Sequence, residues 1–197
     1  MSKAELLEAM LERCGALRRG HFLLSSGLHS PAYVQCALLL EEPRRAREVG
    51  AALAAELAGL RPDSVLAPAL GGVIIGHEVA VALGVPFRVA EREGTGLALR
   101  RGFALAAGER VVVVEDVVTT GKSTLETAAL AEAAGARVVG IGSIIDRSGG
   151  RHGFTVPYAG LLRLDLPTYA AEACPLCADG STAVKPGSRP QPRAAAS

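Results

Sequence analysis

The stretch VVVVEDVVTTGKST, residues 111–124, brings an apolar run, two acids and a helix start close together in the chain. Four consecutive valines are typical of a strand that is buried on both faces of a parallel sheet. Glu115 and Asp116 come directly after them, and the chain then enters TTGKST. Open parallel sheets bind their ligands at the carboxyl ends of the strands. The stretch therefore predicts a strand that brings two carboxylates to a ligand site.

Strand and helix patterns alternate on both sides of this stretch, from about residue 43 to residue 146. This alternation predicts an α/β fold in which helices cover both faces of a parallel sheet. The strands are expected at residues 64–68, 86–91, 110–116 and 137–146, and the helices at residues 43–60, 71–84 and 123–136. A further helix is expected near the N-terminus, where Ser2 and Glu5 form a capping-box pattern. Pro43 suits the first turn of its helix.

Composition limits the class of protein. The chain has 197 residues, of which 49% are hydrophobic and 21% charged, with a net charge of +1. These values predict one globular domain with a sizeable core, and they give no reason to expect a nucleic-acid partner. No secretory leader is evident, so a cytoplasmic location is expected. Residues 65–85 are apolar enough to suggest a membrane span, but Pro68, Gly71 and Glu78 favour a strand, a turn and a helix.

Two nucleotide-binding motifs are excluded by their glycines. GKST resembles the end of a P-loop, but the glycine that a P-loop needs five residues before Gly121 is replaced by Asp116. A dinucleotide fingerprint at Gly140 and Gly142 lacks its third glycine, since Ile145 stands there. The stretch therefore predicts neither an ATPase nor a dinucleotide-binding enzyme.

The remaining chemistry points to a sugar phosphate. Backbone N–H groups and hydroxyls at Thr119, Thr120 and the helix start after them suit a phosphate monoester. Two carboxylates beside that loop would repel a polyphosphate but would accept hydrogen bonds from sugar hydroxyls. Ribose 5-phosphate satisfies both requirements. A capped helix after a strand end is the purely structural alternative.

The segment resembles the phosphoribosyl pyrophosphate (PRPP) motif of type I phosphoribosyltransferases: four apolar residues, two acids, two apolar residues and Thr-x-Gly. The resemblance implies a central, mainly parallel five-stranded sheet flanked by helices, with a small N-terminal hood. It implies one domain over residues 1–185, with the hood formed mainly by residues 1–40 and in part by about 150–185. A flexible tail is expected at residues 186–197.

Other segments resemble the orotate branch of that family. HFLLSSGLHSPAYVQC resembles its hood, APALGG its pyrophosphate loop, AEREGTGLALRRGF its mobile catalytic loop, and IIDRSGG its base-binding strand end. CPLC…KPGSR is also similar to the C-terminus of one group in this branch. The resemblance implies transfer of ribose 5-phosphate from PRPP to orotate N1, giving orotidine 5′-monophosphate and pyrophosphate in pyrimidine (UMP) synthesis.

The resemblance also implies roles for individual residues. Asp116, Glu115, Arg92 and Arg100 are the expected catalytic residues. The residues expected to contact PRPP are Glu115, Asp116, Val117, Val118, Thr119, Thr120, Gly121, Lys122 and Ser123. Orotate is expected to contact Thr119 and Arg147. The pyrophosphate group is expected at the loop of Ala69, Leu70, Gly71 and Gly72. Mg²⁺ is expected as a cofactor held mainly by PRPP and water, with no direct ligand from a protein side chain.

The sequence departs from many orotate enzymes in its basic residues. Ser25, Gly71 and the loop around residues 94–96 stand where many of them carry lysines. Arg92, Arg100 and Arg101 are the candidates to supply that charge, and a solvated basic hairpin is the alternative. Lys122 either adds charge to the phosphate loop or points to solvent. A homodimer is expected, in which the loop of residues 91–107 reaches the neighbouring subunit's site.

Two other functions remain open at this stage. One is a phosphoribosyltransferase for another nucleobase, such as a purine, which the hood and Arg147 disfavour. The other is a non-catalytic PRPP-binding regulator, which would usually carry a nucleic-acid-binding module.

The four cysteines predict no disulfide framework. Cys174 and Cys177 form one CxxC pair, and a second pair with zinc-like spacing is absent from the sequence. A redox role is also disfavoured, because the pair does not open a helix after a first strand. Buried or incidental cysteines are therefore the prediction, and metal binding by the pair is left open.

Overall fold

The structure is a computed structural model that describes residues 2–24 and 26–186. This described part divides into two compact units. The first comprises residues 2–16 and 35–165, and the second comprises residues 17–34 and 166–186 without residue 25. Residues 187–197, where most of the tail is expected, lie outside the described part.

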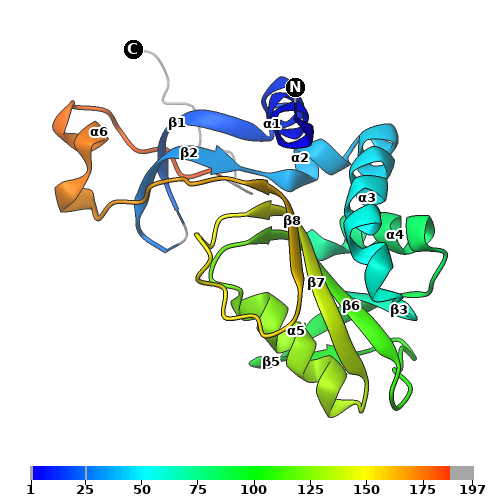
Figure 1. The fold of residues 1–197 in the computed structure, drawn as a ribbon. Coiled ribbons are helices and arrows are strands. Elements are labelled where there is room, and N and C mark those ends of the chain that lie inside the picture. Colours follow the sequence, from blue (N-terminus) through cyan, green and yellow to red (C-terminus); the bar gives the residue numbers. More distant parts are fainter. Residues whose placement is uncertain (1, 25, 187–197) are drawn as a thin grey trace. The chain divides into compact units, whose positions relative to one another are not determined.

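A twisted sheet forms the centre of the first unit (Figure 1). Its described strands are β5 (Gly96–Leu99), β4 (Phe87–Glu93), β3 (Ser64–Pro68), β6 (Arg110–Val118), β7 (Arg137–Asp146) and β8 (Tyr158–Arg163), in that order across the sheet. Neighbours from β4 to β8 pair in parallel, and β5 pairs with β4 antiparallel. The mainly parallel sheet with five parallel strands is confirmed, and β5 is an additional edge strand.

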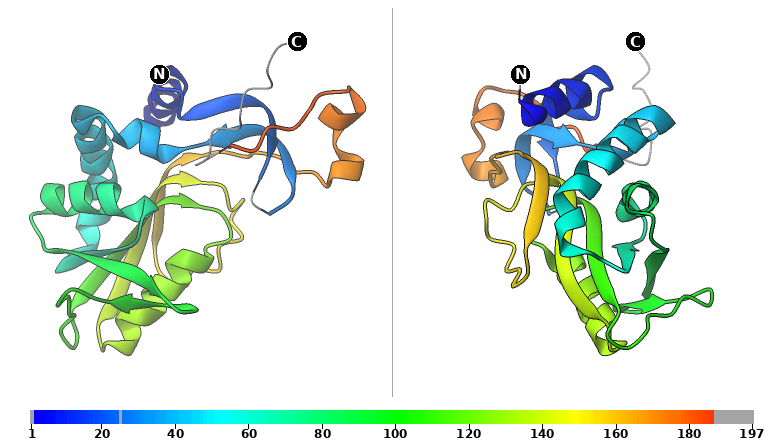
Figure 2. Two further views of the ribbon diagram at one scale, coloured as in Figure 1. Left: turned by 180° about the vertical axis from the view of Figure 1, so that it is seen from behind. Right: turned by 45° about the vertical axis from the view of Figure 1, so that its right-hand side comes forward.

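Helices cover both faces of this sheet, as predicted (Figures 1 and 2). Helices α3 (Pro43–Leu57) and α4 (Gly71–Leu83) lie on one face, and α5 (Lys122–Ala133) lies on the other. The first unit also contains α1 (Lys3–Arg13), α2 (Cys36–Leu40) and the 3₁₀ helix η1 (Ala58–Leu60). The capping box of Ser2 and Glu5 is present at α1, and Pro43 opens α3, so both predictions are confirmed.

The valines of β6 explain why that strand is central. All four are fully buried. Val111 and Val113 belong to the core cluster that contains Ala131 of α5. On the opposite face, Gly140 and Gly142 of β7 leave room for leucines of α3 and η1. A Cβ atom on Gly142 would lie 2.9 Å from a methyl group of Leu57, so these glycines serve helix–sheet packing and bind no dinucleotide.

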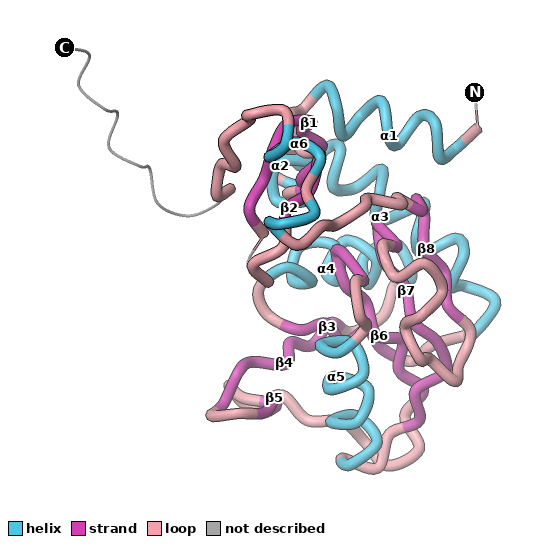
Figure 3. Tube along the Cα trace, turned by 90° about the vertical axis from the view of Figure 1, so that its left-hand side faces the viewer, coloured by secondary structure: helices cyan, strands magenta, loops and turns pink. Residues whose placement is uncertain are grey.

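The segment expected as a mobile loop, residues 91–107, is partly regular. Its first residues complete β4, and Gly96–Leu99 returns as β5 in a hairpin. Leu97 and Leu99 of this hairpin pack against the core cluster, and Figure 3 shows the hairpin beside α5. Alternating apolar side chains therefore extend the sheet in a segment where the family resemblance implied a mobile loop.

The second unit is built around an antiparallel hairpin, β1 (Leu17–Leu23) and β2 (His29–Val34). The C-terminal chain pairs with it through isolated bridges from Tyr169 to His29 and from Val184 to Phe22. This chain also contains η2 (Ala171–Ala173) and α6 (Pro175–Ala178).

The two cysteines of the CxxC pair lie in this second unit, where Cys174 is buried and Cys177 is partly exposed. Cys174 and Cys177 lie against His21 and His29, so a second pair of possible metal ligands is present. It comes from the hairpin and not from a second CxxC motif, which is why cysteine spacing did not predict it.

No helix in the described part is long and apolar enough to cross a membrane. Residues 65–85 form most of β3, a turn and α4, as predicted.

Candidate active site

A cavity of about 340 Å³ opens in the first unit at the carboxyl ends of β3 and β6. All nine residues that the sequence assigned to PRPP line it. Its lining consists of Pro68, Ala69, Gly71, Arg92, Leu97 and the continuous run from Glu115 to Thr124. Arg100, Arg147, Leu70 and Gly72 do not line it, although all four were predicted near ligands.

Strand register explains why the cavity opens beside the two acids. Strand β6 was expected to end near Asp116, but it continues to Val118 because Val117 and Val118 still pair with β7. On its other side, the pairing of β6 with β3 reaches only as far as Leu66 and Val113. The two acids therefore lie on a strand that has lost one neighbour, and ligand groups can approach them from that side.

Burial gives the two acids unusual electrostatics. Glu115 is only 7% exposed, and this burial, together with the charge of Asp116, raises its pKa to about 8. Burial also raises the pKa of Asp116, while hydrogen bonds from the Val117 amide and from Glu115 act in the opposite direction. Because the charge of Asp116 helps to keep Glu115 protonated, Asp116 is the carboxylate that ionises first.

The predicted pyrophosphate loop, residues 69–72, passes directly beside Asp116. A Cβ atom on Gly71 would lie 2.6 Å from Asp116 Oδ1, so the absence of a side chain leaves room for the carboxylate. Ala69 and Gly71 line the cavity. The Ala69–Leu70 peptide bond is cis, and Leu70 is 87% exposed. Gly72 packs against β3 and the Val114 carbonyl, so its role is close packing.

The predicted phosphate loop leads into the N-terminus of α5. Gly121 is the N-cap residue with φ of 77°, and no side chain of the described residues caps the helix there. The first turn contains no acidic residue, and the Lys122 N–H donates to Thr120 Oγ1 at 3.4 Å. The remaining N–H groups of this helix start suit an anion. Lys122 is 81% exposed, and its Nζ lies 3.9 Å from Glu126 Oε1.

The three candidate arginines differ in their relation to the cavity. Arg92 lines it, and its Nη1 lies 2.6 Å from Glu126 Oε2. Arg92 was expected to serve a neighbouring subunit, yet its side chain lines the cavity of its own chain. Arg100 is exposed with Nε 4.0 Å from Glu93 Oε1, and Arg101 makes two hydrogen bonds to Glu91. Arg101 is therefore engaged away from the cavity.

Arg147 stands directly after β7, and its backbone N–H donates to the Val118 carbonyl at 2.8 Å. Asp146 fixes the next turn of the chain, because its Oδ1 accepts hydrogen bonds from the amide and the hydroxyl of Ser148. The backbone of Arg147 is therefore tied to the strand that carries the acids.

Comparisons with known proteins show the family of this chain. Residues 37–153 match the family described as Phosphoribosyl transferase domain. An orotate phosphoribosyltransferase of Thermotoga maritima is 52% identical over 184 residues, which cover 93% of this chain and 98% of that protein. An orotate phosphoribosyltransferase of Caldanaerobacter subterraneus is 47% identical over 189 residues, which cover 96% of this chain and 99% of that protein. The chain belongs to the orotate phosphoribosyltransferase family.

Solved structures of orotate phosphoribosyltransferases share this fold. The enzyme of Aeropyrum pernix matches with a TM-score of 0.69 at 29% identity, over 81% of this chain and 93% of that one. The Mycobacterium tuberculosis enzyme, in complex with inorganic phosphate, matches with a TM-score of 0.65 at 28% identity, over 82% and 95%.

Some residues that line the cavity lie in the quoted motifs but were assigned to no ligand. They are Pro68 in APALGG, Leu97 in AEREGTGLALRRGF and Thr124 in TTGKST. Glu126 was also missed, although its spacing of four residues from Lys122 on a helix predicts an ion pair. Its stronger contact, to Arg92, depends on the β4–β5 hairpin and has no signal in the local sequence.

Proposed function

We propose that the chain transfers ribose 5-phosphate from PRPP to orotate N1, forming orotidine 5′-monophosphate and pyrophosphate in pyrimidine synthesis. The observation that carries this proposal is the cavity in which the buried carboxyl of Glu115 and the half-buried carboxylate of Asp116 adjoin the N-terminus of α5, whose N-cap residue, Gly121, has no side chain. The helix end suits a 5-phosphate, and the carboxylates suit the ribose hydroxyls.

N–H groups bind the negative part of the substrate, and a carboxylate stabilises the positive charge that develops during the reaction. N–H groups between Thr119 and Ser123 hold the 5-phosphate, and Asp116 accepts hydrogen bonds from the ribose. As the bond from the anomeric carbon to pyrophosphate breaks, positive charge develops on the sugar, and the ionised carboxylate of Asp116 stabilises it. The N1 anion of orotate forms the new bond from the opposite face, so no general base is required.

The leaving group and the base meet different residues. Ala69 and Gly71 face the departing pyrophosphate, and Arg92 neutralises part of its growing charge. Arg147 offers a planar guanidinium to the carboxylate of orotate, and Thr119 lies between base and sugar phosphate. Movement of the segment 91–107 over the bound substrates would exclude water and limit PRPP hydrolysis.

Mg²⁺ belongs to the proposal as a cofactor. The cavity fits a metal ion that PRPP brings with it, because the Asp116 carboxylate can accept hydrogen bonds from the waters of a hard cation, which prefers oxygen ligands. Mg²⁺ held mainly by PRPP and water would neutralise charge on the pyrophosphate.

The proposal also includes a homodimer and a cytoplasmic location. Because Arg92 lines the cavity of its own chain, we assign it to the same subunit as Asp116. Arg100 is exposed directly after β5, and we assign it to the neighbouring subunit's site. Mixing subunits that carry different substitutions separates these two assignments.

A nucleobase panel tests the choice of base. The purified chain, PRPP and Mg²⁺ are incubated with orotate, uracil, adenine, hypoxanthine or guanine, and each nucleotide product is quantified. Orotate should exceed the others in kcat/KM by at least about a hundredfold, because a site built for a charged group discriminates strongly against bases without it. Preferred turnover of a purine would contradict the assignment, and PRPP binding without any nucleotide would favour a regulator.

A further inference from the structure

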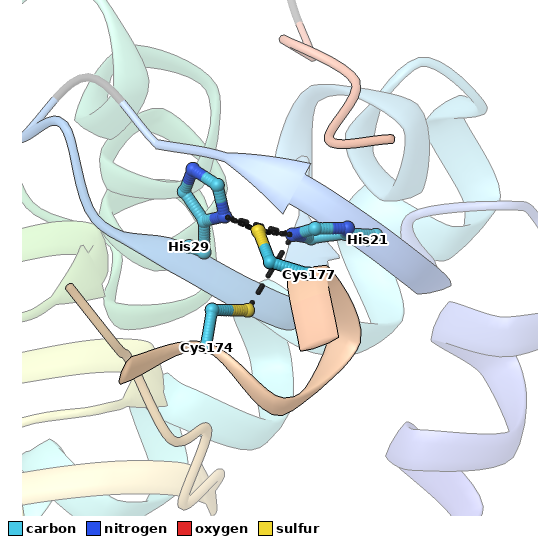
Figure 4. Close-up of side chains that lie close together, drawn as sticks. All are labelled: His21, His29, Cys174 and Cys177. Carbon is cyan, nitrogen blue, oxygen red and sulfur yellow. Dashed lines mark hydrogen bonds between the residues drawn. The ribbon is translucent and has the colours of Figure 1, made fainter. Parts of the chain in front are cut away.

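Four side chains with metal-binding atoms converge within the second unit. His21 lies on β1, His29 opens β2, Cys174 precedes α6 and Cys177 lies within it. Figure 4 shows their ring nitrogens and sulfurs pointing toward a common centre. One ligand atom from each residue lies within 4.8 Å of all the others.

Four of the six separations between these atoms are close to the edges of a tetrahedral zinc site, and the other two are at most 4.8 Å. Zn–N bonds of about 2.0 Å and Zn–S bonds of about 2.3 Å give edges of about 3.3 Å between nitrogens and about 3.6 Å between nitrogen and sulfur. His21 Nε2 lies 3.5 Å from Cys174 Sγ and 3.8 Å from Cys177 Sγ, and His29 Nδ1 lies 3.3 Å from Cys177 Sγ. The two imidazole nitrogens, at 2.8 Å, would need to separate by about half an ångström.

A backbone contact prepares His21 for a metal. Its Nδ1 lies 3.0 Å from the carbonyl oxygen of Ser181, which can only accept a hydrogen bond. Nδ1 therefore carries the proton, and the lone pair of Nε2 points into the cluster. A second hydrogen bond of this kind is the usual way in which proteins orient a metal-binding histidine.

Backbone pairing already places the ligands. The amide and carbonyl of His29 exchange hydrogen bonds with those of Tyr169, and the His21 carbonyl accepts from the Val184 amide. The hairpin and the C-terminal chain are therefore aligned on both sides of the cluster. Binding of an ion would require small side-chain adjustments and no rearrangement of the chain.

We propose that His21, His29, Cys174 and Cys177 bind one structural Zn²⁺ ion. Two thiolates and two neutral imidazoles balance the charge of Zn²⁺, which matters because three of the ligands are at most 8% exposed. Two sulfur and two nitrogen donors in a tetrahedron favour zinc among the common metals. Four protein ligands fill its coordination shell, so the site is structural and not catalytic.

The small size of the second unit means that a bound metal ion would stabilise it. The unit consists of two short stretches of chain and, among its described residues, few buried apolar side chains. Units of fewer than about 70–80 residues rarely gain enough stability from their core alone, and natural ones often add a metal, a disulfide or a partner. The described cysteines are free thiols, so no disulfide supplies the link. Zinc would join the hairpin to a segment far along the sequence.

Metal content tests the proposal on the intact chain, expressed without a histidine tag. Mass spectrometry of the elements in the purified protein should give one zinc per chain. Protein stripped with a chelator under reducing conditions should take up one equivalent of Co²⁺. The bound Co²⁺ should show the visible bands of a tetrahedral site and a thiolate charge-transfer band in the near ultraviolet. Failure of both the isolated and the reconstituted protein to hold one equivalent overturns the proposal, as does a Cys174–Cys177 disulfide found by peptide mapping of protein kept under reducing conditions.

Variants locate the ion. Cys177→Ser and His29→Gln should lose most of the zinc, while Cys14→Ser should retain it, because Cys14 lies in the first unit outside the cluster. Full zinc content in both cluster variants places the ion elsewhere and overturns the assignment. The wild-type cobalt spectrum does not depend on whether these variants fold.

Discussion

Gly121 lies directly against the carbonyl oxygen of His152, and a Cβ atom on Gly121 would approach that oxygen to 2.7 Å. Gly121 also has φ of 77°, a conformation that side chains disfavour. The turn from the predicted phosphate loop into α5 therefore requires glycine for two separate reasons.

Gly121→Ala should weaken PRPP binding by at least about tenfold, because the N–H groups of the helix start must move. The free energy of unfolding should fall by about 1–3 kcal/mol. Titration calorimetry and urea unfolding measure the two effects. Gly59→Ala is the control, since nothing lies within 4 Å of its added Cβ. Unchanged PRPP affinity in Gly121→Ala would remove the loop from the phosphate site.

Glu115 should make stability depend on pH. Its folded pKa of about 8 lies above its usual value of 4.5, so the folded chain keeps a proton that the unfolded chain loses between these values. The free energy of unfolding contributed by Glu115 therefore falls as pH rises through this window and levels off above pH 8. Glu115→Gln removes this loss of stability, because glutamine carries no charge at any pH in this range. Relative to wild type, it should gain on the order of a few kcal/mol between pH 5.5 and 8.5.

Urea unfolding of the ligand-free protein across this range measures the difference. Glu109→Gln is a useful contrast: burial raises the pKa of Glu109, but contacts with Ser64, Ala106 and Arg88 outweigh it and lower the pKa. Its stabilising effect is already complete at pH 5.5, so this variant should show a constant loss. A Glu115→Gln difference that is flat with pH would mean that Glu115 is ionised in the folded chain.

Much of this site could be predicted from sequence, for a physical reason. The run of Val111–Val114 can be satisfied only by a strand buried on both faces, and such a strand delivers the next residues of the chain to the ligand edge. Gly121 could also be predicted, because the turn from strand to helix needs a residue without Cβ.

Other features depend on contacts between distant segments. The contact of Arg92 on β4 with Glu126 on α5 joins two residues that are more than thirty positions apart in the chain, and the family resemblance implied a mobile loop in the segment that contains Arg92. The meeting of His21 and His29 with the two C-terminal cysteines depends on chain pairing across more than a hundred residues. The spacing of residues within one segment predicts neither the Arg92–Glu126 contact nor the cluster of histidines and cysteines.

Arg147 should govern the base and not the sugar phosphate. Arg147→Ala should weaken orotate binding by about 2–4 kcal/mol through the loss of a charge-assisted pair. PRPP affinity should change far less, and separate titrations with each ligand measure both. Arg137→Ala is the matched control, because Arg137 lies at the opposite end of the same strand. Equal losses for both ligands would contradict a base-specific role.

Mixed dimers should show whether Arg92 and Arg100 act in the site of their own subunit or of the neighbouring subunit. Asp116→Asn and Arg100→Ala should each reduce the rate by on the order of a hundredfold or more, since each removes charge from the transition state. Mixed after dissociation and reassembly, they should recover about a quarter of wild-type activity, since half of the dimers then hold one intact site of two.

Asp116→Asn mixed with Arg92→Ala should recover none, because both groups serve the same chain's site. Mass spectrometry of the mixtures confirms subunit exchange. Confirmed exchange without recovery for the Arg100 pair would reject the shared site, and recovery with the Arg92 pair would place Arg92 in the neighbouring site.

The most direct measurement is the stoichiometry of the reaction itself. The purified chain is incubated with equimolar PRPP and orotate in the presence of Mg²⁺, and both products are quantified by chromatography. The account predicts equal amounts of orotidine 5′-monophosphate and pyrophosphate, with no ribose 5-phosphate released by water. Loss of PRPP without formation of the nucleotide, or no loss of PRPP at all, would contradict it.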